Sequence, residues 1–123
     1  MSNKVTSAFV SGKLPGLNDY VDACRENRFK AAKMKREVEH LIHIQTLRLS
    51  PITSKIFVRF TWYEETARRD PDNVCFAKKF ILDAFQKSGK LQNDNSKWIA
   101  GFSDRFVYGK GQGVLIEVID NEI

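Results

Sequence analysis

An alternation of apolar and polar residues predicts strands at several places along the chain. The clearest is residues 54–64, SKIFVRFTWYE, where every second side chain is apolar and β-forming residues dominate. Residues 5–10 show a weaker strand pattern. In residues 98–119 two apolar stretches flank the glycine-rich segment 109–113, so we expect two strands joined there as a β-hairpin with one of the longer loops.

Apolar residues with helical spacing occupy the intervals between these strands. After the chain-breaking sequence GKLPG they recur about every 3.6 residues, from Asn18 as a plausible N-cap to the neighbourhood of Leu49. The period is interrupted around residues 27–28, so this stretch predicts either one kinked helix or two helices. Residues 73–87 predict a further helix, because apolar residues recur there at i, i+3, i+4 and i+7 and Gly89 follows as a stop.

The resulting order, β-α-β-α-β-β, predicts an α+β fold in which helices pack on one mixed sheet. The chain has 123 residues, of which 42% are hydrophobic and nine are Phe, and this is enough to build a single core. No internal repeat, low-complexity tract or linker divides it. We therefore expect one domain over residues 1–123.

Cysteine usage and hydropathy bear on the cellular setting. Cys24 and Cys75 are far apart, the chain has no Cys-x-x-Cys pair, and its first residues lack the apolar run of a signal peptide. We expect a reducing, cytoplasmic setting with both thiols as small apolar fillers. No stretch approaches the ~18 consecutive apolar residues of a membrane helix, so a soluble protein without a membrane partner is expected.

The net charge of +5 is concentrated in the first part of the chain. Residues 1–49 carry nine Lys and Arg against five Asp and Glu, whereas the remaining residues carry eleven against ten. Five of these cations lie within residues 28–36, with no acid between them. Such a patch is typical of a surface that binds a polyanion, because each neutralised phosphate releases counterions; the alternative is the solvated face of a helix. We expect phosphate contacts from Lys33, Lys35 and Arg36, since cations near a helix start oppose the macrodipole and so indicate an anionic partner.

The hexapeptide RRDPDN at residues 68–73 places two carboxylates two positions apart. Pro71 should hold its neighbours extended, and alternate side chains of an extended chain point the same way, so Asp70 and Asp72 are expected to face one point. A hard cation such as Mg²⁺ or Mn²⁺ would relieve their mutual repulsion. The alternative is a turn or helix cap, since Asp and Asn are common there for local hydrogen-bonding reasons.

Asp94 is a candidate third carboxylate. It lies in a short loop before the strand predicted from Trp98. If that strand pairs beside the strand of residues 54–64, Asp94 could return to the end of the sheet that carries Asp70 and Asp72. An ordinary Asn-Asp-Asn turn is an equally good interpretation.

Two adjacent lysines could add a cation to this site. On one continuous helix, Lys79 lies about 20° from Asp72 at 100° per residue, whereas Lys78 points about 120° away from that face. We therefore expect Lys79 to lean toward the metal and Lys78 to be solvated, with an ion pair from Lys79 to Asp83 as the alternative. Three carboxylates, a lysine and a basic surface together indicate metal-dependent hydrolysis of a phosphodiester.

Residues 68–95, RRDPDNVCFAKKFILDAFQKSGKLQNDN, resemble the core motif of the RusA family of Holliday-junction endodeoxyribonucleases, which are common in phages and prophages. Residues 14–39, LPGLNDYVDACRENRFKAAKMKREVE, resemble the amino-terminal part of phage-type members more loosely. The resemblance implies a Mg²⁺-dependent homodimer that nicks opposing strands of a four-way DNA junction. A twofold dimer suits a junction that has two symmetry-related scissile phosphates.

The resemblance also implies roles for individual residues. It assigns catalytic and metal-binding roles to Asp70, Asp72 and Asp94, and it makes Lys79 the catalytic lysine. The segment that follows Asp72 is about one helical turn longer than in the founding type, which leaves Lys78 as an alternative to Lys79. Three residues of the motif are candidate DNA contacts: Arg68, Arg69 and Asn73.

A second hypothesis belongs to a different functional class. The chain could be a small basic dimer that binds DNA or RNA without cutting it, with its aspartates serving only as turns and caps. Cleavage of branched DNA with Mg²⁺, and its absence with EDTA, separates the two.

Overall fold

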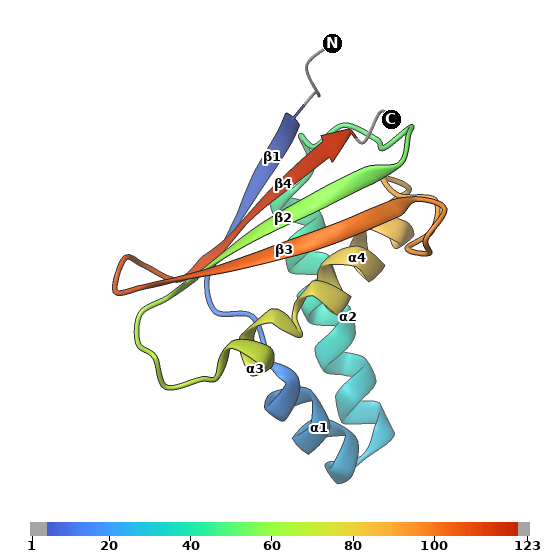
Figure 1. Ribbon diagram of the computed structural model, residues 1–123. Coiled ribbons are helices and arrows are strands. Elements are labelled where there is room, and N and C mark those ends of the chain that lie inside the picture. The colour runs from blue at the N-terminus through green and yellow to red at the C-terminus, as the bar shows by residue number, and fades with distance from the viewer. Residues whose placement is uncertain (1–4, 121–123) are drawn as a thin grey trace.

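The computed structural model describes residues 5–120 and confirms the α+β class, with helices packed against a four-stranded mixed sheet (Figure 1). None of the helices in this part of the chain is long and apolar enough to cross a membrane. The elements in chain order are β1 (Val5–Ser11), α1 (Leu17–Glu26), α2 (Arg28–Gln45), β2 (Ile56–Glu64), α3 (Pro71–Cys75), α4 (Lys78–Lys87), β3 (Ile99–Tyr108) and β4 (Gly113–Asp120).

The strand order is β1-β4-β2-β3, so the predicted hairpin between the last two strands is wrong. β2 lies between them, parallel to β3 and antiparallel to β4 (Figure 1). The connection passes the end of β2, where the Gly109 N–H donates to the carbonyl of Glu64 at 2.9 Å. Gly109 and Gly111 have positive φ angles of 81° and 102°, which favour glycine. A glycine-rich loop predicts a reversal of the chain, but not whether a third strand lies between its two arms.

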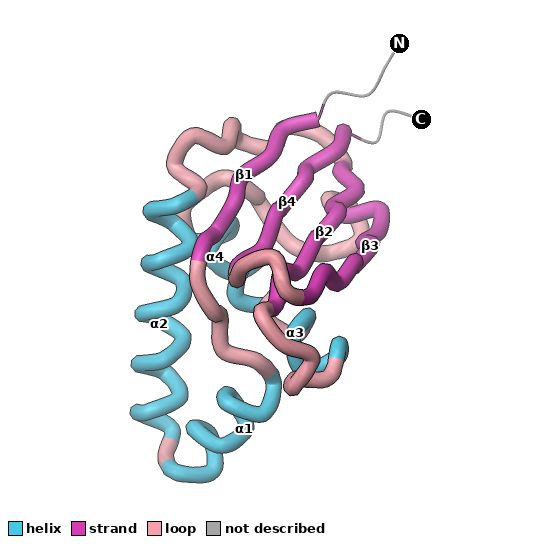
Figure 2. Tube along the Cα trace, turned by 90° about the vertical axis from the view of Figure 1, so that its left-hand side faces the viewer, coloured by secondary structure: helices cyan, strands magenta, loops and turns pink. Residues whose placement is uncertain are grey.

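One face of the sheet carries the core. Along β2, alternate residues from Ile56 to Glu64 are buried, and the residues between them are partly or fully exposed. The helices lie to one side of the strands (Figure 2), and α4 contributes three of the large, fully buried side chains on that side, Phe80, Ile81 and Phe85. The period-2 strand pattern and the helical spacing in residues 73–87 therefore face one another across the core.

The long amino-terminal helical stretch is two helices that meet at Asn27. This residue is extended, with φ −171° and ψ 160°, and its side chain accepts a hydrogen bond from the Lys30 N–H at 2.8 Å. It thus ends α1 and caps α2. The predicted N-cap Asn18 is wrong by two residues: Gly16 is the cap, and its N–H donates to Asp19 Oδ2 at 2.8 Å.

The helix predicted over residues 73–87 is also divided. α3 ends at Cys75 and α4 begins at Lys78, and the predicted stop is confirmed because Gly89 follows α4 with φ 80°. The thiols differ in burial: Cys75 is half-buried, but Cys24 is exposed, so the prediction of an apolar filler is wrong for Cys24.

Candidate functional site

Asp70 and Asp72 stand at the start of α3 with their carboxylates uncommitted. Pro71 occupies the first turn, and Asp70 before it is extended as predicted, with φ −67° and ψ 151°. Asp72 already belongs to the helix, so the prediction that both aspartates are extended and face one point is confirmed only for the backbone of Asp70. Both residues are exposed, and the Asp70 side chain makes no capping hydrogen bond. Asp70 does occupy the N-cap position of α3, but within residues 5–120 neither carboxylate accepts a hydrogen bond or joins an ion pair.

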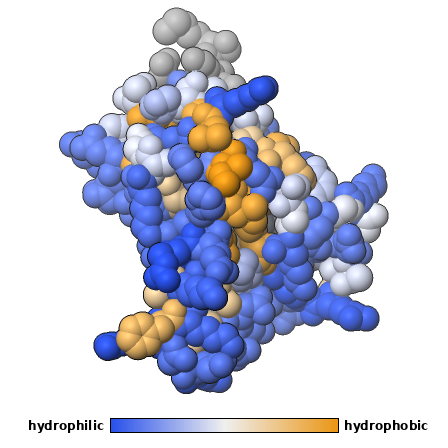
Figure 3. All heavy atoms as spheres, turned by 180° about the vertical axis from the view of Figure 1, so that it is seen from behind, coloured by the Kyte–Doolittle hydropathy of each residue, from blue (hydrophilic) through white to orange (hydrophobic). Residues whose placement is uncertain are grey.

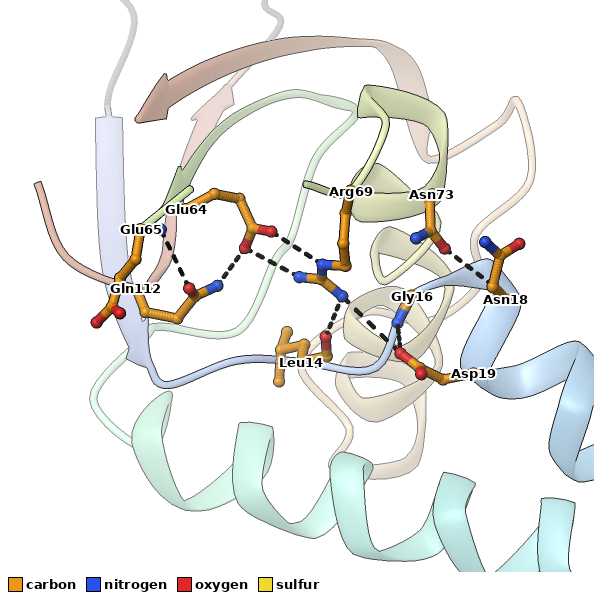
Figure 4. A network of polar contacts seen from close by, with 9 residues as sticks. All are labelled: Leu14, Gly16, Asn18, Asp19, Glu64, Glu65, Arg69, Asn73 and Gln112. Carbon is orange, nitrogen blue, oxygen red and sulfur yellow. Dashed lines mark hydrogen bonds and ion pairs between the residues drawn. The ribbon is translucent and has the colours of Figure 1, made fainter. Parts of the chain in front are cut away.

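Arg69, directly before this pair, is the centre of a largely buried polar network (Figure 4). Its Nε and Nη2 donate to the two carboxylate oxygens of Glu64, each at 2.9 Å, and its Nη1 donates to the carbonyl of Leu14 at 3.0 Å. Gln112 also donates to Glu64, and Asp19 lies 3.9 Å from the guanidinium. A bidentate arginine–carboxylate pair is among the strongest polar contacts in proteins. Arg69, predicted as a phosphate contact, is thus used to join β2 to the segment before α1.

The other predicted contacts in the hexapeptide differ from one another. Arg68 is exposed and forms no ion pair within the described residues. Asn73 instead accepts a hydrogen bond from the Asn18 N–H at 2.9 Å and so joins α3 to the start of α1 (Figure 4). The approach is close enough to require glycine opposite it: a Cβ on Gly16 would lie 2.5 Å from Asn73 Oδ1 and 2.6 Å from its carbonyl oxygen.

Asp94 lies at the other end of the sheet from Asp70. The strand that follows it does pair beside β2, but in parallel, with Ile56 opposite Ile99 and the Ile56 N–H donating to the carbonyl of Trp98 at 2.9 Å. Asp94 therefore reaches the sheet where β2 begins, whereas Asp70 follows the end of β2, roughly 26 Å along the strand. The expectation that pairing would return Asp94 to the Asp70 end is wrong, because it holds only for an antiparallel pair.

Lys79 meets Asp94 at that other end. Its Nζ lies 3.6 Å from Asp94 Oδ2 and 3.1 Å from Asp83 Oδ1, so the alternative of an ion pair with Asp83 is realised. The hydrogen bond to Asp83 raises the pKa of Lys79 and keeps it protonated. The structure brings together the lysine and the third aspartate of the motif, but places them away from the first two aspartates.

Asp83 is the buried link of this chain of charges. Lys35 Nζ lies 2.9 Å from its Oδ2, and this hydrogen bond raises the pKa of Lys35. Burial acts to raise the pKa of Asp83, but the hydrogen bonds from Lys35 and Lys79 outweigh it, and the pKa falls below its ordinary value of 3.8. Lys35 is thus committed within the fold, whereas Lys33 and Arg36, the other predicted phosphate contacts on α2, are exposed.

Lys78 is not solvated, contrary to the sequence prediction. Its side chain is 19% exposed, against 57% for that of Lys79. Its Nζ lies 2.8 Å from Asp104 Oδ2 and 4.7 Å from the ring centroid of Phe102. The prediction assumed one helix from residue 73, and the restart at Lys78 rotates both lysines relative to Asp72. The sequence analysis did not predict a role for Asp104, whose other carboxylate oxygen accepts a hydrogen bond from Trp62 Nε1 at 2.8 Å. The sequence did contain a sign of this role: Asp104 alternates with Phe102 and Phe106 on the face of β3 that lies beside the buried residues of β2.

The donors at Asp70 and Asp72 suit a hard divalent cation. Residues 5–120 contain no group of three or more His, Cys, Asp or Glu side chains placed to hold a metal ion, so the three predicted aspartates do not form one. Two exposed carboxylates nevertheless match Mg²⁺, which keeps several waters and is often bound by one or two carboxylates together with substrate phosphates.

Comparison with known proteins adds no family assignment. No protein-family model matches the chain, and no curated protein matches its sequence. The resemblance of residues 68–95 to the RusA family therefore stays a prediction.

Proposed function

We propose that the protein is a Mg²⁺-dependent endodeoxyribonuclease of branched DNA, such as a four-way junction, with Asp70 and Asp72 as its metal-binding carboxylates. The observation that supports this most is that neither carboxylate is used inside the described fold, although the start of a helix offers both an ordinary capping role. Two exposed carboxylates two positions apart, with no partner among the described residues, are free to bind one Mg²⁺ together with its waters.

The chain's own residues would divide the work as follows. Asp70 and Asp72 hold the cation, which when bound activates water and stabilises charge on the phosphate. Arg68, exposed beside them, binds a neighbouring phosphate, and Lys33 and Arg36 on α2 bind the backbone farther away. A twofold dimer would present two such sites to the two equivalent strands of a junction.

A cleavage assay with matched variants tests this proposal. Wild type is expected to cut a labelled four-way junction with Mg²⁺ and to leave it intact with EDTA. Asp72→Asn is expected to bind the junction with near-normal affinity but to cut at least about 100-fold more slowly, in the range of other losses of catalytic electrostatics. Asp22→Asn, an equal change of charge at an exposed position of α1, should cut normally. Mg²⁺-dependent cutting by Asp72→Asn at the wild-type rate would refute the role of Asp72.

Asp94→Asn in the same assay tests whether the metal site needs only Asp70 and Asp72, as the structure indicates, or also Asp94, as the resemblance implies. If Asp70 and Asp72 suffice, this variant keeps most of its activity. Loss of cutting as complete as in Asp72→Asn would mean that the active form brings Asp94 to the metal, as the RusA-like motif implies.

A non-catalytic nucleic-acid binder is the second candidate, because the three aspartates of the motif do not converge within residues 5–120. Binding of branched DNA by wild type without any cutting, in Mg²⁺ or in Mn²⁺, would favour it.

A further inference from the structure

Strand β1 is an edge of the sheet whose outer backbone groups are largely free. At its last residue the edge is closed, because the Ser11 N–H donates to Gln45 Oε1 at 2.8 Å and the Ser11 carbonyl accepts from Gln45 Nε2 at 3.4 Å. Backbone groups of alternate residues point to the same edge of an antiparallel strand. The N–H and C=O of Ser7 and Phe9 therefore point outward as well, and nothing within residues 5–120 pairs with them.

This edge lacks the features that usually prevent strand pairing. The sequence VTSAFVS contains no charged residue and no proline, and its register with β4 runs from Val5 to Ser11 without a bulge. The opposite edge, β3, carries Asp104 and Arg105. Because exposed edges are normally blunted by charge, proline or bulges, β1 is the edge suited to receive another strand.

An apolar stripe at the end of α2 reaches this edge. Leu41 and Ile44 on α2 and Leu47 in the turn after it are spaced three residues apart and are 42%, 51% and 60% exposed. A groove of about 350 Å³ runs between β1 and the end of α2, and Ala8, Ile44 and Leu47 are among its lining residues. The view from behind shows an apolar strip through the upper half of the surface, separate from an apolar side chain at the lower left (Figure 3).

We propose that β1 pairs antiparallel with β1 of a second copy of this chain, so that two sheets become one of eight strands. A twofold axis through Ala8 would place Ser7 opposite the partner's Phe9, and their outward N–H and C=O groups would bond reciprocally. The same axis brings the two α2 stripes toward one another across the groove. Such an interface is isologous, as a closed dimer requires.

Charge favours a second copy over nucleic acid as the occupant. The chain carries a net charge of +5, so two copies repel unless they meet through an uncharged surface. Strand β1 and the three stripe residues carry no charge, and Arg48 is the one charged residue that lines the groove. A polyanion would instead select the basic first half of α2. The inference develops the dimer contained in the proposed function, but it does not depend on catalysis.

Oligomeric state tests the interface directly. Sedimentation of wild type should show a dimer, and the double variant Ile44→Lys/Leu47→Lys should sediment as a monomer at the same concentration. Phe29→Lys replaces a side chain that is 72% exposed at the opposite end of α2, and it should remain dimeric. Circular dichroism of each variant confirms that it is folded.

A cross-link tests the register. In a background of Cys24→Ser and Cys75→Ala, the variant Ala8→Cys should form an intermolecular disulfide on mild oxidation, because residues opposite each other on the axis have Cβ atoms about 4.5–5.5 Å apart. The matched variant Ser103→Cys on β3 should not.

A monomeric wild type, or a dimer unaffected by Ile44→Lys/Leu47→Lys in which Ala8→Cys fails to cross-link, would overturn the interface. Cutting of the junction by a monomer would refute the interface and support the proposed nuclease activity. A β1-paired dimer that never cuts would refute the nuclease activity and support the interface.

Discussion

The two ends of the sheet use their charges in opposite ways. Where β2 ends, Arg69 is consumed by a bidentate pair with Glu64, but Asp70 and Asp72 beside it have no partner within residues 5–120. Where β2 begins, Asp94 is paired with Lys79, which is paired in turn with Asp83. Paired charges hold elements together, and unpaired carboxylates remain available for a cation.

The same distinction separates neighbours in the sequence. Arg69 is paired and Arg68 is not; Lys35 lies 2.9 Å from Asp83, whereas Lys33 on the same helix is exposed and only reaches Glu37 at 3.9 Å. If pairing within the fold decides the role of each charged side chain, removing a paired charge should lower the free energy of unfolding. Removing an unpaired charge should change only binding or catalysis. Three measurements test this difference, and a fourth tests the uncharged contact between Gly16 and Asn73; they are given in order of decreasing expected effect.

Replacing Arg69 should cost the most stability. Arg69→Ala leaves the buried Glu64 carboxylate without its main partner, and breaking a buried pair on one side costs about 3–5 kcal/mol. Chemical denaturation should show this loss, and Arg68→Ala should stay within about 0.5 kcal/mol of wild type. Equal losses of stability in Arg69→Ala and Arg68→Ala would contradict the difference between the paired and the unpaired arginine.

Adding a methyl group at Gly16 should have the next largest effect. Gly16→Ala places a Cβ against the Asn73 side chain and backbone, and overpacking of this kind costs about 1–3 kcal/mol. Asn73→Ala gives the side chain room but still leaves the Asn73 carbonyl 2.6 Å from the new Cβ. The double variant should therefore remain less stable than Asn73→Ala alone, as a thermal melt would show; equal stability would mean that α1 and α3 shift apart freely.

The Lys35–Asp83–Lys79 chain should make stability depend on pH. Because the pKa of Asp83 is lowered on folding, its contribution is present above about pH 3.8 and is lost as the pH falls through the lower folded pKa. The pKa values of Lys35 and Lys79 are raised, so their contribution is present below about pH 10.5 and is lost above it. Asp83→Asn should remove the acid dependence at this site. Unfolding curves of both proteins between pH 2 and 6 measure this, and parallel pH profiles would contradict it.

Replacing single cations on α2 should have the smallest effect, a change in the salt dependence of DNA binding. Lys33→Ala and Arg36→Ala should each reduce the slope of log K against log salt by about 0.9, the contribution of one phosphate contact. Lys35→Ala should leave the slope nearly unchanged, because Lys35 is bonded to Asp83. Equal changes at Lys33 and Lys35 would show that DNA draws Lys35 out of its pair.

The spacing of apolar residues, together with Gly, Pro and Asn at chain breaks, was sufficient to predict much of the fold. The strand predicted within residues 54–64 and the interruption at Asn27 follow from local patterns, and the structure has both, with β2 at Ile56–Glu64. Strand order did not follow, because a loop such as residues 109–112 leads to the same end of a sheet whether or not a third strand intervenes.

The placement of the candidate site failed for related reasons. Asp94 lies at the far end because β3 runs parallel to β2, and strand direction is a property of the whole sheet. Lys78 is half-buried because the helix restarts, and the pattern of apolar residues hardly marks that break. Arg69 and Asn73 are committed to partners more than 50 positions away in the sequence, Leu14 and Asn18, which no local pattern shows.

Binding of a divalent cation by Asp70 and Asp72 can be observed in crystals soaked in Mn²⁺. Anomalous diffraction should show a peak within coordination distance of both carboxylates, and the peak should disappear in Asp72→Asn. A Mn²⁺ peak on other residues, with none at Asp70 and Asp72, would contradict the claim.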